Sequence, residues 1–120
     1  MNNFRDQGYH LTGKIFNVAK LDGLTDASFM FALFKEILND LRIDASEARQ
    51  VAYATTAGMV AVMVTTEGML SITSFTENHS AFVDFMCFKR QSPVELVKAY
   101  KKFSANLDAR NNSYTIIFRT

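Results

Sequence analysis

Three strand-like segments follow one another through the middle of the chain, and this feature constrains the fold most. Met59–Thr66 (MVAVMVTT) and Met69–Phe75 (MLSITSF) are separated only by Glu67 and Gly68, and Ala81–Phe88 (AFVDFMCF) follows after a short polar turn. The first segment is apolar on both faces, which is typical of a central strand. Strands joined by such short breaks form hairpins. We therefore predict the centre of an antiparallel sheet here.

A strand and a helix precede this block. His10–Val18 (HLTGKIFNV) has the pattern of a strand, with Leu11 and Ile15 on one face. Thr25 or Asp26 can cap the helix that follows, because their side-chain oxygens reach free backbone N–H groups. Apolar residues then recur at helical spacing, in a stripe that would pack against a sheet: Met30, Leu33, Phe34, Ile37, Leu38 and Leu41.

A second helix and a last strand follow the block. Ser92 can cap this helix, Pro93 suits its first position, and Glu95 can close a capping box. We expect Asn111–Asn112 to end the helical region and Ser113–Phe118 to form the last strand. The apolar stripe of the helix consists of Leu96, Val97, Tyr100, Phe103 and Leu107.

The order of these elements predicts an α+β fold. Ile43–Gln50 is a polar connection, and Val51–Thr56 is either a strand or an extended entry into the next one. We expect the order βαβββαβ and a mostly antiparallel sheet with both helices on one face, which is a two-layer α/β sandwich. A length of 120 residues without repeat or linker predicts a single domain over residues 1–120.

The second face of this sheet also carries apolar residues. Left exposed, they would form a large adhesive patch, which monomeric proteins rarely show. We therefore expect a homo-oligomer, most simply a homodimer in which this face meets another subunit.

Composition excludes several classes of protein. The formal net charge is +1, from 13 basic and 12 acidic side chains, so a nucleic-acid partner is not expected. Cys87 is the single cysteine, which does not favour a secreted protein stapled by disulfides. No apolar signal core and no membrane-length apolar run are present, so we expect a cytoplasmic protein without membrane contact. No metal-ligand spacing, phosphate-binding loop or serine-hydrolase elbow occurs, and no metal is expected.

Several motifs resemble those of the pyruvoyl-dependent S-adenosylmethionine decarboxylases of bacteria and archaea. Gly8, His10 and Leu11 resemble the opening Gly-x-His-Leu strand of that family, and Gly58 with its apolar strand resembles the segment before the processing site. In the family, a serine after a glutamate cleaves the chain and becomes a pyruvoyl group. That ketone binds the substrate amine and accepts electrons while CO₂ leaves. The resemblance covers nearly the whole chain and implies a polyamine context.

The processing positions implied by this resemblance are degenerate. Gly68 stands where the family has its serine, Met69 replaces the next histidine, and Thr73 replaces a histidine that assists processing. Phe88 occupies the position of the family's acid cysteine, and Cys87 comes one residue early, which points it to the opposite face unless a bulge intervenes. We therefore expect no pyruvoyl group and no other cofactor.

The binding positions implied by the resemblance are better preserved. Phe75 occupies the family's stacking aromatic position, Glu77 the turn glutamate that binds ribose hydroxyls, and Tyr53 can supply a second aromatic ring. Phe75 and Glu77 also have structural interpretations: Phe75 as an aromatic residue of the core, and Glu77 as part of an ordinary polar turn. Glu67, Glu77 and Asp84 are the candidate catalytic acids; Asp84 interrupts an apolar strand, so it either lines a pocket or is held by a structural partner.

Three functions remain open from the sequence. The first is a diverged member that does not process itself and binds S-adenosylmethionine or a related adenosine compound, with lyase chemistry as an extension. The second is a pseudoenzyme that regulates an active decarboxylase paralogue through the shared oligomer face. The third is an active decarboxylase with a shifted processing site, for which Thr66 or Ser71 would supply the oxygen nucleophile.

Overall fold

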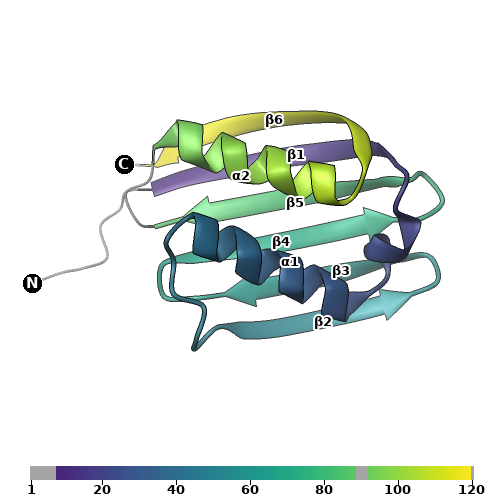
Figure 1. Cartoon of the computed structure of the whole chain (residues 1–120), viewed down its shortest axis with the longest axis horizontal. Coiled ribbons are helices and arrows are strands. Elements are labelled where there is room, and N and C mark those ends of the chain that lie inside the picture. Colours follow the sequence, from purple (N-terminus) through teal and green to yellow (C-terminus); the bar gives the residue numbers. More distant parts are fainter. Residues whose placement is uncertain (1–7, 89–91, 120) are drawn as a thin grey trace, which may run out of the picture.

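The computed structural model describes residues 8–88 and 92–119, which form two layers (Figure 1). The prediction that the N-terminus has no apolar signal core concerns residues 1–7 in part, and these lie outside the described residues. The strands are β1 (Gly8–Val18), β2 (Arg49–Thr55), β3 (Gly58–Val64), β4 (Gly68–Phe75), β5 (Ser80–Cys87) and β6 (Ala109–Arg119). The helices are α1 (Ala27–Asp40) and α2 (Pro93–Asn106), with a short 3₁₀ helix η1 (Leu21–Leu24).

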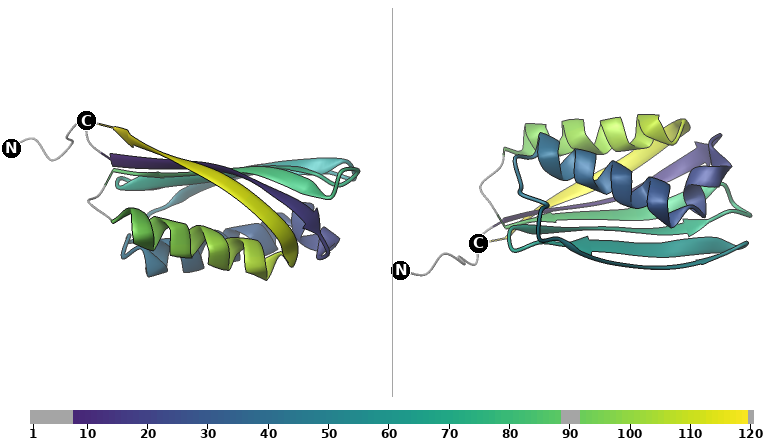
Figure 2. Two further views of the ribbon diagram at one scale, coloured as in Figure 1. Left: turned by 90° about the horizontal axis from the view of Figure 1, so that it is seen from above. Right: turned by 60° about the horizontal axis from the view of Figure 1, so that its bottom comes forward.

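All six strands form one antiparallel sheet in the order β2-β3-β4-β5-β1-β6. Both helices cover the same face and leave the other face bare (Figure 2). The predicted α+β two-layer sandwich is therefore confirmed. The sheet has one more strand than the predicted order, because the segment after Ala48 is strand β2, which pairs with β3 from Arg49↔Val64 to Thr55↔Gly58. No helix in the described residues is long and apolar enough to cross a membrane.

Local side-chain caps begin both helices. The Asp26 side chain accepts a hydrogen bond from the Phe29 backbone N–H at 3.1 Å, so Asp26 rather than Thr25 caps α1. The Ser92 hydroxyl accepts from the Glu95 N–H at 3.2 Å, with Pro93 in the first position of α2. Each cap satisfies a backbone donor that the helix itself cannot.

The core lies between the helices and one face of the sheet. Phe85 meets the ring of Phe103 edge-on at 5.5 Å and that of Tyr100 at 6.0 Å, while Phe34 stacks on Phe103 at 5.9 Å. All four residues are fully buried. Aromatic rings of this size supply much of the apolar area removed from water, and so join the two layers.

The prediction that Asn111–Asn112 ends the helical region was wrong. The chain reverses at Asp108, which adopts a φ of 50°, and β6 begins at Ala109. Asp tolerates this left-handed conformation better than most residues. Asn111 instead pairs with Phe16 in the ladder, and its side chain accepts a hydrogen bond from Asn17 at 2.7 Å. The asparagine pair is therefore part of the sheet.

Candidate functional site

The sheet face away from the helices, here called the open face, carries the candidate site. Side chains alternate across each strand, so the residues that follow the buried positions of a strand point to this face. Large apolar side chains of the open face remain substantially exposed, among them Val51, Tyr53, Val60, Val64, Phe82 and Ile117. Such a continuous patch is typical of a binding or subunit surface.

A hollow of about 360 Å³ lies on this face near the ends of β2, β3 and β4. Two predicted ligand-binding residues, Tyr53 and Phe75, line it together. They stand on β2 and β4, with β3 between them, so about 9–10 Å separates the two strands. Tyr53 pairs with Val60 whereas Phe75 pairs with Gly58, so the two aromatic residues are offset by two positions along the strands, and the exposed Val60 stands on β3 between them. The remaining lining residues are Thr55, Ala57, Gly58, Met59, Val60, Thr73 and Ser74.

Gly58 lines the hollow and lets strands β3 and β4 approach closely there. It pairs with Thr55 on one side and Phe75 on the other, and it has a φ of +155°. A Cβ atom there would lie 2.0 Å from the backbone carbonyl oxygen of Ser74, a distance that no side chain tolerates. Glycine is therefore required at this position by the backbone of β4. The sequence alone, in which Gly58 only resembles part of a family motif, does not reveal this close approach, because it depends on the pairing with β4.

Glu77 stands in the β4–β5 turn, at the same edge of the sheet as the hollow. Two hydrogen bonds join this turn to the β2–β3 turn: Thr76 donates its backbone N–H to the Ala57 carbonyl at 3.0 Å and its hydroxyl to the Thr56 carbonyl at 2.9 Å. The Glu77 side chain is exposed, and in residues 8–88 and 92–119 it has no ion-pair partner. It does not line the hollow, but it is placed at its rim.

Asp84 has a structural partner on the open face. The Nε2 atom of His10 lies 3.0 Å from Oδ1 of Asp84, and the two side chains are 16% and 39% exposed. The Nδ1 atom of His10 is buried and has no hydrogen-bond partner in the described residues. A hydrogen on Nδ1 would thus be a buried, unsatisfied donor, whereas a hydrogen on Nε2 is donated to the carboxylate. The second oxygen of Asp84 stays available.

The processing positions are not gathered at the hollow. Gly68 begins β4 and Phe75 ends it, so about 24 Å separates them along the strand. Gly68 is buried on the helix-covered side, where an added Cβ would meet the Met86 carbonyl oxygen at 2.8 Å. Met69 and Thr73 point to the open face. Phe88 is exposed just beyond β5.

Cys87 points into the helix-covered core. It is 1% exposed, and the β4–β5 ladder runs from Gly68↔Cys87 to Phe75↔Ser80 without a bulge. Cys87 comes one residue before Phe88, the position of the family's cysteine in the resemblance. Because no bulge intervenes, its side chain points to the opposite face of the sheet.

The three candidate acids also lie apart. Glu67 stands in the β3–β4 turn, where its carbonyl accepts a hydrogen bond from the Phe88 N–H at 2.8 Å; Glu77 lies at the opposite end of β4, and Asp84 lies in the middle of β5. Within one chain they do not form a common acid–base site. In the described residues, no cluster of three His, Cys, Asp or Glu side chains could hold a metal ion.

Comparison with known proteins agrees with the architecture. A family model described as S-adenosylmethionine decarboxylase matches residues 9–120. The structure is similar to that of the adenosylmethionine decarboxylase from Aquifex aeolicus VF5, with a TM-score of 0.75 over 96% of this chain and 92% of that chain. The two sequences are 15% identical, so this likeness shows the fold alone. A search of curated proteins finds no significant match.

Proposed function

The chain belongs to the S-adenosylmethionine decarboxylase family, and we propose that it is a diverged member that does not process itself. We propose further that it binds S-adenosylmethionine or a related adenosine compound in the hollow between Tyr53 and Phe75. The observation that carries the binding proposal is this hollow on the open face, which Tyr53 and Phe75 line from two different strands.

The residues present do not fit a pyruvoyl group. Glycine at position 68 has no side-chain oxygen to attack the preceding carbonyl. The position is also closed, because backbone oxygen of Met86 and the side chain of Ile43 lie 2.8 and 3.4 Å from where a Cβ would stand. Thr66 and Ser71, the other candidate nucleophiles, would each cut the chain at a different place in the sheet. We therefore assign no step to this cofactor.

The hollow suits the base and ribose of a nucleoside. Stacking of a base on an aromatic side chain contributes about 1–3 kcal/mol, and the hollow offers two such side chains. Phe75 is supported by an edge-on contact with Phe82 at 5.6 Å, which fixes its ring. Tyr53 is 76% exposed and is free to turn onto a bound base. Glu77 at the rim is placed to accept hydrogen bonds from ribose hydroxyls.

Any chemistry on this ligand would differ from decarboxylation. The sulfonium of S-adenosylmethionine is already activated for elimination, so a lyase would need mainly orientation and one carboxylate base. Asp84 is the candidate acid on the open face itself, whereas Glu67 and Glu77 stand in turns at opposite ends of β4. Lyase activity therefore remains an extension of the binding proposal.

A second subunit is the partner that the open face favours. Its exposed apolar residues extend from β2 to β6, and we propose that they pack against another copy of the chain in a homodimer. The same surface supports the alternative function, a regulatory subunit that pairs with an active decarboxylase. Co-purification with such a decarboxylase would favour the alternative, and a stable homodimer without it would favour the first proposal.

Isothermal titration calorimetry with S-adenosylmethionine and 5′-methylthioadenosine tests the binding proposal. We expect both compounds to bind, and Phe75→Ala to weaken both by about 10-fold or more through loss of one stacking face. Phe88→Ala removes an exposed aromatic at the other end of the sheet and is the matched control. No binding heat and no thermal shift at millimolar ligand would overturn the proposal.

A further inference from the structure

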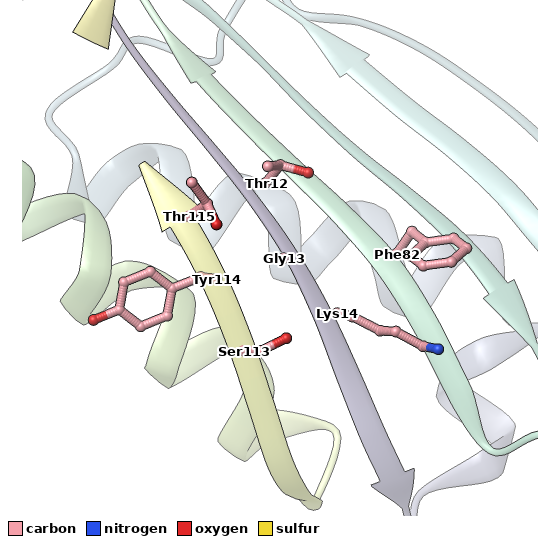
Figure 3. Close-up of a pocket in the computed structure, with 7 residues that line it drawn as sticks. All are labelled: Thr12, Gly13, Lys14, Phe82, Ser113, Tyr114 and Thr115. Atoms are coloured by element: carbon pink, nitrogen blue, oxygen red, sulfur yellow. The ribbon is translucent and has the colours of Figure 1, made fainter. Parts of the chain in front are cut away.

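Two opposite charges lie over the same strand of the open face. Figure 3 shows the Lys14 side chain reaching from β1 across β5, at a hollow of about 260 Å³. Its Nζ atom lies 5.3 Å from the ring centroid of Phe82 and 4.9 Å from that of Phe16. Asp84 follows Phe82 on β5 by two residues and therefore projects from the same face. The open face thus carries a cation and an anion in succession along β5.

Of these two charges, only Asp84 has a polar partner within the chain. Its Oδ1 atom lies 3.0 Å from Nε2 of His10, which leaves the second carboxylate oxygen available. Among the ion pairs of residues 8–88 and 92–119, none includes Lys14. Its contacts with aromatic rings hold the ammonium in place but leave its hydrogen-bond donors unused. Burying such a charge without an acceptor is costly, so a subunit that covers the open face must supply one.

The register of the sheet places Lys14 and Asp84 in two adjacent rows of open-face side chains. Each row crosses all six strands, because directly paired residues of neighbouring strands project from the same face. One row consists of Tyr53, Val60, Thr73, Phe82, Lys14 and Ser113. The next consists of Val51, Val62, Ser71, Asp84, Thr12 and Thr115. In both rows the positions on β2 and β3 are apolar or aromatic, and those on β4, β1 and β6 are polar.

A single two-fold axis brings these two rows together between two copies of the chain. The axis is parallel to the face, crosses the strands and runs midway between the rows. It sets each strand over the same strand of the second copy with reversed direction, and each row over the other row. Strands of packed sheets usually stay within about 30° of alignment, so this is an ordinary sandwich of two sheets. The Lys14 ammonium over β5 then faces Asp84 of the second copy, and symmetry repeats the contact.

The same axis also gives the two faces their greatest overlap. One further row of open-face residues lies on each side of the two central rows. It includes Phe75 and Phe16 on one side, two residues beyond Thr73 and Lys14, and Met69 and His10 on the other. An axis between the central rows therefore crosses the strands near their middle, and all four rows are covered. The register that joins the charges is the one that covers the most apolar surface.

We propose that the open face pairs with a second copy of this chain about this axis, and that reciprocal contacts between Lys14 and Asp84 set the register. Val60 then lies over Val62 of the second copy, so the apolar halves exclude water from each other. The inference rests on the homodimer in the proposed function and does not depend on the ligand. A paralogue without an acceptor in place of Asp84 would leave Lys14 buried and unpaired, which disfavours that partner.

Exchange of the two charges tests this contact. Lys14→Asp and Asp84→Lys each oppose like charges at both contacts of the dimer. When the two variant proteins are mixed, both contacts of the mixed dimer again join opposite charges. The double variant Lys14→Asp/Asp84→Lys restores both contacts within one protein. Lys20→Asp is the control, because Lys20 also lies over a phenylalanine, at 5.0 Å from the ring of Phe29 in helix α1.

Sedimentation equilibrium gives the dissociation constant of the dimer, and native mass spectrometry identifies the mixed dimer by its mass. We expect each single variant to raise this constant at least about 100-fold, because opposed like charges strongly disfavour an interface. The mixture and the double variant should return to within about 10-fold of the wild type. Lys20→Asp should leave the constant unchanged. Mixing is the decisive step, because a defect within one chain is not repaired by a second variant chain.

Three results would overturn the proposal. The first is a monomeric wild type, and the second is a pair of single variants that dimerise as tightly as the wild type. The third is a pair that dissociates and is restored neither by mixing nor in the double variant. Circular dichroism checks the fold of each single variant. The double variant keeps the amino-acid composition of the chain, so it decides the matter even if one single variant does not fold.

Titration of the wild type with 5′-methylthioadenosine separates this proposal from the proposed ligand binding. If the compound binds but the exchanged charges have no effect on the dimer, the contact is overturned and the binding proposal stands. If mixing restores the dimer but the compound does not bind, the contact stands and the binding proposal is overturned.

Discussion

The two ends of strand β4 differ in what surrounds them. At its first residue, Gly68 is enclosed by backbone and by Ile43, on the side of the sheet that the helices cover. At its last residue, Phe75 borders a hollow on the open face. A glycine allows close backbone approach near both ends: Gly68 lies against the Met86 carbonyl, and Gly58, which pairs with Phe75, lies against the Ser74 carbonyl. This contrast supports the proposal that the chain does not process itself and binds its ligand on the open face.

The largest effect is expected at the open end. Gly58→Ala places a Cβ against the Ser74 carbonyl at 2.0 Å in a backbone conformation with φ of +155°. We expect a loss of on the order of 3 kcal/mol in the free energy of unfolding, measured by urea denaturation. Ala54→Val, at an exposed position opposite Met59 in the same hairpin, is the control and should change stability little. Equal stability of the Gly58→Ala protein would contradict the assignment of this glycine.

The next effect concerns ligand affinity. Tyr53→Ala should weaken 5′-methylthioadenosine by about 10-fold, because one of the two stacking faces is lost. Tyr53 is 76% exposed in the single chain but belongs to the face proposed to meet a second subunit, so light scattering must first show that Tyr53→Ala keeps the molar mass of the wild type. Tyr53→Phe should bind as the wild type does, since the ring is kept. A loss of affinity in Tyr53→Phe equal to that of Tyr53→Ala would argue against stacking.

A smaller effect is expected at the closed end. Gly68→Ser restores the family's residue type but forces its Cβ to 2.8 Å from the Met86 carbonyl oxygen. We expect a loss of about 1–2 kcal/mol in stability and no self-cleavage, because the side chain would face the helices. Met69→Ser, one residue later on the open face, is the comparison. Fragments of the Gly68→Ser protein on a denaturing gel would show that the closed end is still competent.

The smallest effect is a pH dependence of stability that belongs to neither end. Burial raises the pKa of Tyr100 from 10.0 to about 12, and its hydroxyl donates to the Ser113 carbonyl at 2.9 Å. The folded state thus favours the protonated phenol. Its stabilisation is complete below the unfolded pKa and is lost as pH rises through the folded pKa.

The comparison protein for this pH dependence is Tyr100→Phe. It loses a hydrogen bond at every pH, but its stability should fall less steeply between pH 10 and 12. Hydrogen bonds to Asp40 and Glu36 raise the pKa of Lys102, and its contribution changes in the same direction in both proteins. Parallel curves for the two proteins would therefore exclude Tyr100 as the source of the difference.

Local sequence signals predicted most of the architecture. The cap at Ser92, the spacing of Met30 to Leu41 and the alternation in Ala81–Phe88 each involve residues close together in the chain. The sequence does not distinguish whether Val51–Thr56 is a strand or an extended entry, because an exposed edge strand such as β2 has a weak apolar pattern. Asn111–Asn112 resembled a turn, but pairing with β1 decided its structure.

The candidate site was less predictable for a related reason. Tyr53 and Phe75 were expected to share a ligand, and they do line one hollow. The pairs His10–Asp84 and Lys14–Phe82 join residues from distant parts of the chain, so only the β1–β5 register brings them together. The side of the sheet that Gly68 faces is likewise a property of the whole β4–β5 ladder.

The central claim is that the chain stays whole while its open face binds a nucleoside, and intact mass spectrometry of the purified protein tests the first part directly. We predict one uncut species of about 13.5 kDa, before and after prolonged incubation with S-adenosylmethionine. Two fragments, one with a blocked pyruvoyl terminus, would contradict the account and show that a nucleophile other than position 68 processes the chain.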